Sequence, residues 1–234
     1  MTRLYRLLVA GTFILLAAGC STLDPRSEDF GPAYQPSNVR GPAAWPAGLR
    51  RVAVLPAHDT TGLLQSNFVS SYDVSWRRAL DRSQRAEFIP IPSVDMVTWT
   101  GRNSLASAGL LPAGFLERVA RGTSAQAVLF IDLNHIKAYP PLALGFRARL
   151  VDPATGETLW MADELFDAAR ADVARSARRY AREQASGIGD SAHGILQSPS
   201  RFSDFAFQAV ASLLPPRTPL VPTSTDEKTA TKNP

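Results

Sequence analysis

Few residues of this chain have side chains and spacings suited to catalysis or metal binding. The 234-residue sequence contains one cysteine and three histidines, and neither His58, His135 nor His193 has a metal-binding side chain three or four positions later. No Gly-x-Ser-x-Gly motif marks a nucleophile, and the glycines at 187 and 189 lack the third glycine and preceding strand of a phosphate-binding loop. The sequence therefore predicts no catalytic residue, no metal site and no enzyme.

Paired carboxylates are a further possible source of chemistry. Asp163, Glu164 and Asp167 fall where a strand is expected to pass into a helix, and a favourable interaction with the helix dipole explains Asp167. Asp132 and His135 are expected on opposite faces of one strand, so they do not form a pair locally. A hydrolytic enzyme therefore remains only as the least favoured alternative.

The one cysteine, Cys20, ends a segment with the layout of a secretory signal peptide. A basic head with Arg3 and Arg6 precedes the apolar run 7–18, which at about 12 residues is too short to span a bilayer as a helix. The ending Leu-Leu-Ala-Ala-Gly-Cys resembles the bacterial lipobox, although Ala17 stands where leucine is commoner. The alternative is an ordinary cleaved signal that happens to contain a cysteine.

The lipobox resemblance implies that Cys20 carries a covalent lipid, which is the only cofactor expected and attaches the protein to a membrane. Ser21 follows the cysteine, where an aspartate would favour the inner membrane of a Gram-negative bacterium. The resemblance therefore implies the periplasmic face of the outer membrane, while the choice between inner and outer membrane stays open.

Composition and charge narrow the class of protein. The chain is 45% hydrophobic and 20% charged, which is sufficient for a folded core. Its net charge of +4 includes Arg3 and Arg6, and the rest of the chain carries only +2. This balance does not indicate nucleic-acid binding, which depends on a strong excess of basic residues.

Four regions follow from the distribution of proline, glycine and apolar residues. We expect a signal peptide at 1–19, a lipidated cysteine with a flexible tether at 20–48, a globular periplasmic domain at 49–214 and a disordered tail at 215–234. Trp45 is unusual in a tether. It either fixes the tether to the surface of the domain or contacts a neighbouring subunit.

The periodicity of apolar residues in the globular domain predicts both strands and helices. The fold class is α/β (α+β-like), with a mixed, largely antiparallel sheet of about five strands flanked by helices. Strands are expected at 50–56, 85–91, 127–137, 142–151 and 157–161, and helices at 63–82, 93–99, 112–121, 166–185 and from 199 to about 213.

Three stretches of this pattern carry a family resemblance. They are Arg-Val-Ala-Val-Leu-Pro at 51–56 with Asp-Thr-Thr-Gly at 59–62, the strand 127–131, and 150–160, where a strand leads through Asp-Pro-Ala-Thr-Gly-Glu to a returning tryptophan. Together they resemble periplasmic lipoprotein domains of curli secretion, of Pel-type polysaccharide export and of peptidoglycan-synthase activators, and the N-terminal domain of the Tol-system propeller protein. The resemblance spans about residues 50–165.

The most distinctive surface feature is a basic ridge, which we define as Arg170, Arg175, Arg178, Arg179 and Arg182. The last four are expected on one face of a helix whose other face is apolar. One interpretation is a solvated face, partly paired with acidic neighbours. The other is contact with an anionic surface such as a lipid phosphate, an acidic polysaccharide or an acidic protein patch.

The resemblance implies a non-enzymatic scaffold or assembly subunit for the transport or biogenesis of envelope components. Envelope proteins are the expected partners, self-association is possible in this class, and no nucleic acid is expected. A lipoprotein that activates a peptidoglycan synthase is the alternative, which a long tether would favour.

Overall fold

The computed structural model describes residues 30–184 and 192–218, without the side chains of residues 66, 67 and 193. The predicted signal peptide, Cys20 and residues 219–234 of the predicted tail lie outside this range. The chain divides into two compact units, Met1–Pro32 and Ala33–Pro234. All of the architecture below belongs to the second unit.

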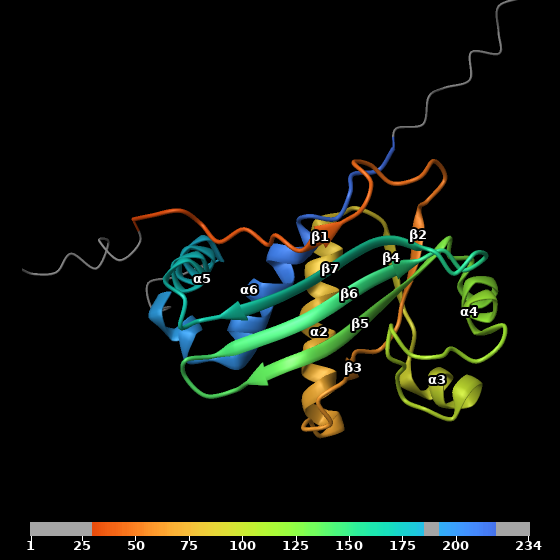
Figure 1. Cartoon of the computed structure of the whole chain (residues 1–234), viewed down its shortest axis with the longest axis horizontal. Helices are drawn as coiled ribbons and strands as arrows, with labels where there is room; N and C mark the ends of the chain where they lie inside the picture. Colours follow the sequence, from red (N-terminus) through yellow and green to blue (C-terminus); the bar gives the residue numbers. More distant parts are fainter. Residues whose placement is uncertain (1–29, 185–191, 219–234) are drawn as a thin grey trace, which may run out of the picture. The chain divides into compact units, whose positions relative to one another are not determined.

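A mixed sheet forms the framework of this unit (Figure 1), and its strand order is β1-β7-β6-β5-β2-β4, with β3 paired to β5. β2 is parallel to both β4 and β5, whereas β5, β6, β7 and β1 are joined by antiparallel pairs. The predicted fold class is confirmed. The strands are β1 (Val39–Arg40), β2 (Arg51–Val54), β3 (His58–Asp59), β4 (Glu87–Pro90), β5 (Ala127–Lys137), β6 (Ala143–Val151) and β7 (Thr158–Asp167).

The sheet has seven strands rather than about five because β1 and β3 contain two residues each, too few to show an apolar period. β4 lies at the edge of the sheet, as its proline predicts, since Pro90 has no N–H to donate to a further strand.

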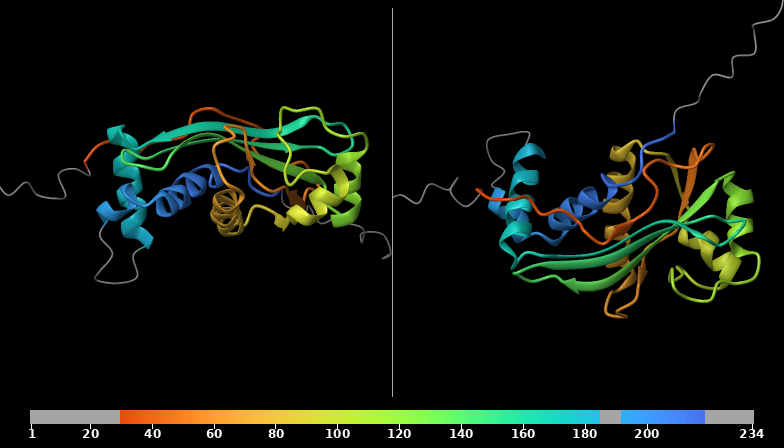
Figure 2. Two further views of the ribbon diagram at one scale, coloured as in Figure 1. Left: turned by 90° about the horizontal axis from the view of Figure 1, so that it is seen from below. Right: turned by 45° about the horizontal axis from the view of Figure 1, so that its top comes forward.

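Helices cover the sheet unequally. α2 (Ser66–Ser83), α5 (Ala171–Gln184) and α6 (Pro199–Ala211) lie along one face of the long strands (Figure 2), with a short 3-10 helix, Ala192–Leu196, beside α5 and α6. α3 (Ser93–Thr100) and α4 (Phe115–Thr123) pack on the other face, mainly against β2 and the first part of β5. The first group buries the larger hydrophobic core.

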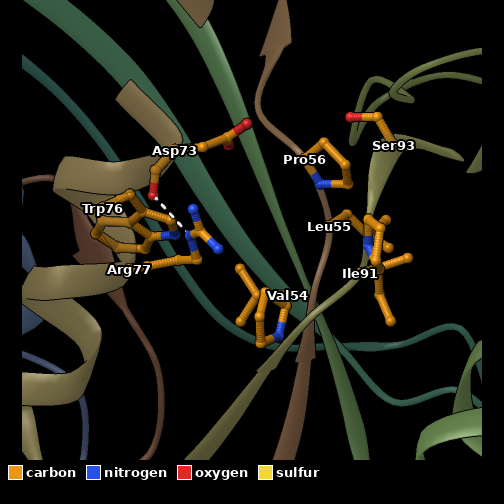
Figure 3. Close-up of a pocket in the computed structure, with 10 residues that line it drawn as sticks. Val54, Leu55, Pro56, Asp73, Trp76, Arg77, Ile91 and Ser93 are labelled. Carbon is orange, nitrogen blue, oxygen red and sulfur yellow. Dashed lines mark hydrogen bonds between the residues drawn. The ribbon is translucent and has the colours of Figure 1, made fainter. Parts of the chain in front are cut away.

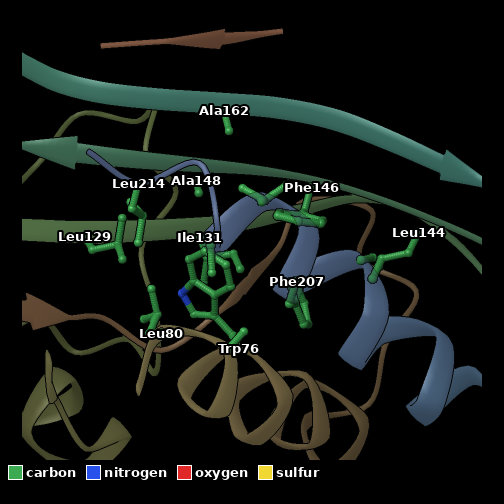
Figure 4. Packing of buried hydrophobic residues seen from close by; sticks show 14 of the residues in the cluster. Trp76, Leu80, Leu129, Ile131, Leu144, Phe146, Ala148, Ala162, Phe207 and Leu214 are labelled. Atoms are coloured by element: carbon green, nitrogen blue, oxygen red, sulfur yellow. The ribbon is translucent and has the colours of Figure 1, made fainter. Parts of the chain in front are cut away.

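Three aromatic rings connect the main helices to the sheet at the centre of this core (Figure 4). Trp76 of α2, Phe146 of β6 and Phe207 of α6 have ring centroids 4.7–6.0 Å apart in tilted or edge-on arrangements. Phe68 lies two helical turns before Trp76 on the same apolar stripe of α2, yet Phe68 is 55% exposed. Phe68 lies in the first turn of α2, where the helix has not yet reached α6 and the sheet.

The last long strand continues further than its sequence pattern suggested. β7 extends to Asp167, and α5 begins only at Ala171, so the prediction of a helix from residue 166 is wrong at its start. Phe166 is fully buried and pairs with Leu144 across the sheet. Asp163 and Glu164 consequently lie within a strand, and alternation directs them to opposite faces.

The predicted tether requires a correction, because residues 33–48 pack on the domain. β1 pairs with β7, and Trp45 is only 2% exposed within the core. The Trp45 N–H donates to the carbonyl of Pro216 at 3.0 Å, and the Thr218 hydroxyl donates to the carbonyl of Trp45. Trp45 therefore fixes this segment to its own domain and also holds the beginning of the predicted tail. Only residues 20–32 remain for a tether, of which 20–29 lie outside the described structure.

Candidate functional site

The basic ridge is organised by α5. The buried residues of this helix are Val173, Ala174, Ala177 and Ala181. Arg175, Arg178 and Arg182 follow one another at spacings of three and four, so they form one row along the helix. Arg179 lies one position beside this row. Arg182 is exposed, whereas the other three arginines are half-buried. The structure thus brings the four predicted helical arginines together on one side.

Arg170 differs from the other members of the ridge. It precedes α5 and forms an ion pair with Asp172 at 2.7 Å, and its guanidinium carbon lies 5.1 Å from the centre of the Tyr34 ring. The hydrogen bond from Arg170 is the main cause that lowers the pKa of the Asp172 carboxyl. The guanidinium of Arg170 therefore interacts mainly with groups of its own domain, the Asp172 carboxylate and the Tyr34 ring.

A buried carboxylate holds the segment that enters the domain beside α5. Glu164 accepts hydrogen bonds from the Tyr34 hydroxyl at 2.6 Å, from the Asn38 N–H at 2.6 Å and from the Ser37 N–H. Burial, followed by the bond to Glu164, raises the pKa of the Tyr34 hydroxyl far above its usual range, so this phenol remains a donor. The sequence pattern indicated for Glu164 only a possible role in acid chemistry, because its partners are more than a hundred residues away in the chain.

A crevice opens where the parallel strands β2 and β4 end. The chain leaves β2 towards α2 on one face of the sheet and leaves β4 towards α3 on the other face. Connections that diverge in this way create a gap at the carboxyl ends of parallel strands, the usual ligand position in open α/β sheets. The family-like stretches 51–56 and 59–62 supply part of its lining, but the sequence did not indicate a ligand there.

The crevice is lined by the end of β2, the end of β4 and one side of α2 (Figure 3). Its narrow centre is a cavity of about 140 Å³, bordered by Val54–Pro56, Pro90–Ser93, Asp73, Trp76 and Arg77. Wider hollows of about 450 Å³ and 420 Å³ adjoin it, the first along β4 and α2 and the second towards His58 and Ser104. The three share lining residues and form one continuous groove.

The polar side chains that line this groove differ in the hydrogen bonds they form. Burial raises the pKa of the Asp73 carboxyl, although the Ala57 N–H donates to its Oδ1 at 2.7 Å. The indole nitrogen of Trp76 is buried and has no hydrogen-bond partner among the described residues. The Nε of Arg77 donates to the main-chain carbonyl of Asp73 at 3.3 Å (Figure 3).

The two described histidine side chains are not arranged for metal binding. His58 Nδ1 is 3.0 Å from the Ser104 hydroxyl, and His135 pairs with Gly145 on the outer part of the sheet. Asp132 is buried and accepts bonds from the N–H and hydroxyl of Ser107. Within residues 30–184 and 192–218, no three His, Cys, Asp or Glu side chains come together as metal ligands would.

Searches for related sequences give no positive result. No protein-family model matches this chain. No curated protein matches it significantly.

Among the described residues, no helix combines the length and the apolar character needed to cross a membrane.

Solved structures with a similar chain path do exist. The PelC dodecamer from Paraburkholderia phytofirmans is 18% identical, with a TM-score of 0.45 over 77% of this chain and 98% of its own. Lipoprotein GNA1162 from Neisseria meningitidis is 18% identical, with a TM-score of 0.39 over 50% of this chain and 81% of its own. The C-terminal domain of LpoB from Escherichia coli is 18% identical, with a TM-score of 0.34 over 50% of this chain and 82% of its own.

PelC and LpoB correspond to two of the kinds of lipoprotein that the sequence resembles, those of Pel-type export and of synthase activation. At such low identity the likeness concerns the fold alone.

Proposed function

We propose that this protein is a lipoprotein, anchored through Cys20 to the periplasmic face of the outer membrane, that serves as a non-enzymatic assembly or scaffold subunit in envelope transport or biogenesis. The observation that carries the proposal is the position of the only cysteine. It ends the lipobox-like sequence and precedes by 13 residues the point, Ala33, at which the chain joins the folded unit.

The attachment of the N-terminal segment supports this role. Thirteen residues between lipid and domain span at most about 45 Å when fully extended. The Glu164 hydrogen bonds fix the direction in which the chain enters the domain. A short tether on a fixed entry point holds the domain near the membrane surface.

The same length weakens the alternative, an activator that reaches through the peptidoglycan to a synthase. That alternative depended on a tether of 28 residues, which would span about 90 Å when taut. Since residues 33–48 are packed on the domain, this reach is roughly halved.

Lipidation can be tested directly in a Gram-negative host. Cells that express the protein are given a radiolabelled fatty acid, and outer-membrane and soluble fractions are compared for wild type and Cys20→Ser. We expect label and outer-membrane location for wild type only. Equal location of both proteins, without label, would overturn the proposal.

The basic ridge is the surface we propose to contact an anionic partner, and its position beside the entry of the tether makes the anionic membrane surface the first candidate. The double variant Arg178→Glu/Arg179→Glu should weaken binding to vesicles that contain phosphatidylglycerol, and added salt should weaken wild-type binding. The matched control is Arg102→Glu/Arg121→Glu, which changes two exposed arginines of the α3–α4 region. Equal effects of both double variants would show net charge to be responsible and the ridge to be only a solvated face.

Oligomeric state separates the remaining possibilities. Light scattering on purified protein should give a mass well above the 25.3 kDa of one chain if it assembles as a scaffold. A monomer at all concentrations would instead favour a role in which the domain acts on another envelope protein.

A further inference from the structure

We propose that the crevice between β2, β4 and α2 binds an extended polypeptide segment of a partner protein. This inference goes beyond the proposed anchoring function and does not depend on lipidation of Cys20. It rests on the topology of the crevice, on an unpartnered buried donor and on the distribution of donors, acceptors and apolar walls.

The first argument is the position of the groove. Among the described strands, β2 and β4 are parallel neighbours whose following helices lie on opposite faces of the sheet. The gap at their carboxyl ends is a consequence of chain topology, so side-chain packing alone cannot close it. Main-chain and side-chain groups around such a gap are available to a ligand.

The second argument is the indole N–H of Trp76. Its ring is almost fully buried in the core, yet its nitrogen has no acceptor in the part of the chain that the structure describes. A buried donor without a partner destabilises the folded state, and an incoming acceptor would recover this free energy. Trp76 borders the narrow cavity together with its neighbour Arg77 (Figure 3).

The third argument is the polarity of the α2 wall. Asp73, Trp76 and Arg77 are three and four positions apart and therefore line one side of the helix. Trp76 and Arg77 offer donors, whereas Asp73 offers a carboxylate whose charged form is disfavoured by burial. A ligand that suits this wall carries an acceptor and a donor a few ångströms apart, as a peptide unit does.

The opposite wall selects against a nucleotide. Phosphate groups are usually held by main-chain N–H groups of a glycine-rich turn. Here the strand ends are Leu55–Pro56 and Pro90–Pro92, whose proline rings replace such N–H groups with apolar surface. The cavity of about 140 Å³ between these prolines has room for one aliphatic side chain, and the adjoining hollows accommodate the chain on either side.

The experiment selects ligands without assuming a partner. A displayed library of random 12-residue peptides is selected on the purified full-length protein, and the selected peptides are synthesised and titrated into protein with ¹⁵N-labelled tryptophan. The Trp76 indole resonance, assigned by its loss in Trp76→Phe, should shift on binding. Peptides should bind with Kd values below about 0.1 mM, equivalent to roughly −5.5 kcal/mol.

Two matched pairs of variants test the location. Ser93 borders the cavity and is exposed, whereas its neighbour Val94 is exposed but does not border it. We expect Ser93→Tyr to weaken binding at least tenfold and Val94→Tyr to leave it unchanged. Trp76→Phe should weaken binding about fivefold through loss of the donor. Trp45→Phe should not, although Trp45 also has a buried indole nitrogen without a partner.

The outcomes decide the proposal. Selected peptides that bind Ser93→Tyr as tightly as wild type, or a selection that yields no binder in this affinity range, would overturn it. Because Ser93→Tyr changes an exposed residue, its thermal midpoint should equal that of wild type, so failure to fold would not explain a loss of binding. Cys20→Ser should retain peptide binding, and this separates a failure of the groove from a failure of the anchor.

Discussion

The two halves of the sheet bury their residues in different ways. In the parallel half, consecutive residues of β2 and of the first part of β5 are all buried or nearly so, because α2 lies on one face and α3 and α4 lie on the other. In the antiparallel half, β7 alternates between buried and accessible residues, because only one face is covered by helices. The sheet is thus covered by helices on both faces at one end, the two-sided half, and on one face at the other end, the one-sided half.

This difference separates the candidate functions in space. The two-sided half creates the crevice, since its strands lead to helices on opposite faces. The one-sided half receives the N-terminal segment on its edge, where Glu164 and β1 hold it beside α5. A partner in the crevice and a membrane at the basic ridge would therefore use different halves of the domain.

Neighbouring residues of the two-sided half should both be essential for stability. Leu129 and Phe130 are adjacent on β5, fully buried, and belong to different hydrophobic clusters. We expect Leu129→Ala to lower the free energy of unfolding by about 2–5 kcal/mol and Phe130→Ala by about 3–5 kcal/mol. Urea unfolding measures both. A small effect of either variant would contradict burial on both faces.

Adjacent residues of the one-sided half should give unequal effects. Phe166 is fully buried, whereas Leu165 is 46% exposed on the other face of β7. Phe166→Ala should cost about 3–5 kcal/mol, and Leu165→Ala less than about 1 kcal/mol. The same urea titration provides the comparison. Equal losses would indicate that a partner or a second copy covers the outer face in solution.

Removing the charge of Glu164 should loosen the N-terminal segment. Three hydrogen bonds end on this carboxylate, and a hydrogen bond to a charged group contributes about 1.5–3 kcal/mol. Glutamine keeps one acceptor oxygen, so only part of this contribution is lost. Glu164→Gln should therefore speed hydrogen exchange at residues 34–40 and lower the free energy of unfolding by about 2 kcal/mol. The exposed Glu157→Gln is the control. Exchange that changes across the whole sheet, rather than near the segment, would contradict a local role.

The smallest effects concern two carboxylates near the crevice that have opposite pKa shifts. Burial raises the pKa of Asp73, so its contribution to stability is present in acid and is lost as pH rises through the folded-state pKa. Burial also acts on Asp59, but hydrogen bonds from the Thr61 hydroxyl and the Leu64 N–H outweigh it and lower the pKa. Its contribution is present at neutral pH and is lost as pH falls.

Consequently, replacing these residues should change stability in opposite directions. Each variant is compared with wild type at the same pH by its free energy of unfolding. For Asp59→Asn, this free energy relative to wild type should be lower at pH 7 than at pH 3. For Asp73→Asn, it should be higher at pH 7 than at pH 3. Urea midpoints at the two pH values measure both differences. The same sign for both variants would contradict the proposed environments.

Sequence patterns predicted the long elements well, because each is a local property. The alternation along 127–137 and 142–151 identified β5 and β6, and the helical period identified α2 and α6. The patterns gave the wrong start for α5, since the residues around 166 satisfy either a strand or a helix over a short window. They also missed β1, whose two residues are held by backbone bonds to β7 and need no apolar side chain.

The candidate sites show the same division. The row of arginines on α5 could be predicted, because positions three and four apart share a helix face. The hydrogen bonds of Glu164 and the lining of the crevice could not, because their members come from segments far apart in the chain.

By itself, the sequence determined the lipobox-like Cys20, the long elements of an α/β domain and the basic face of one helix, since each depends on neighbours within a few residues. Only the tertiary structure decided where the tether ends, which carboxylate holds it and where a crevice opens. These features depend on strand order and on the faces to which the connecting helices are directed. Local periodicity contains no information about either.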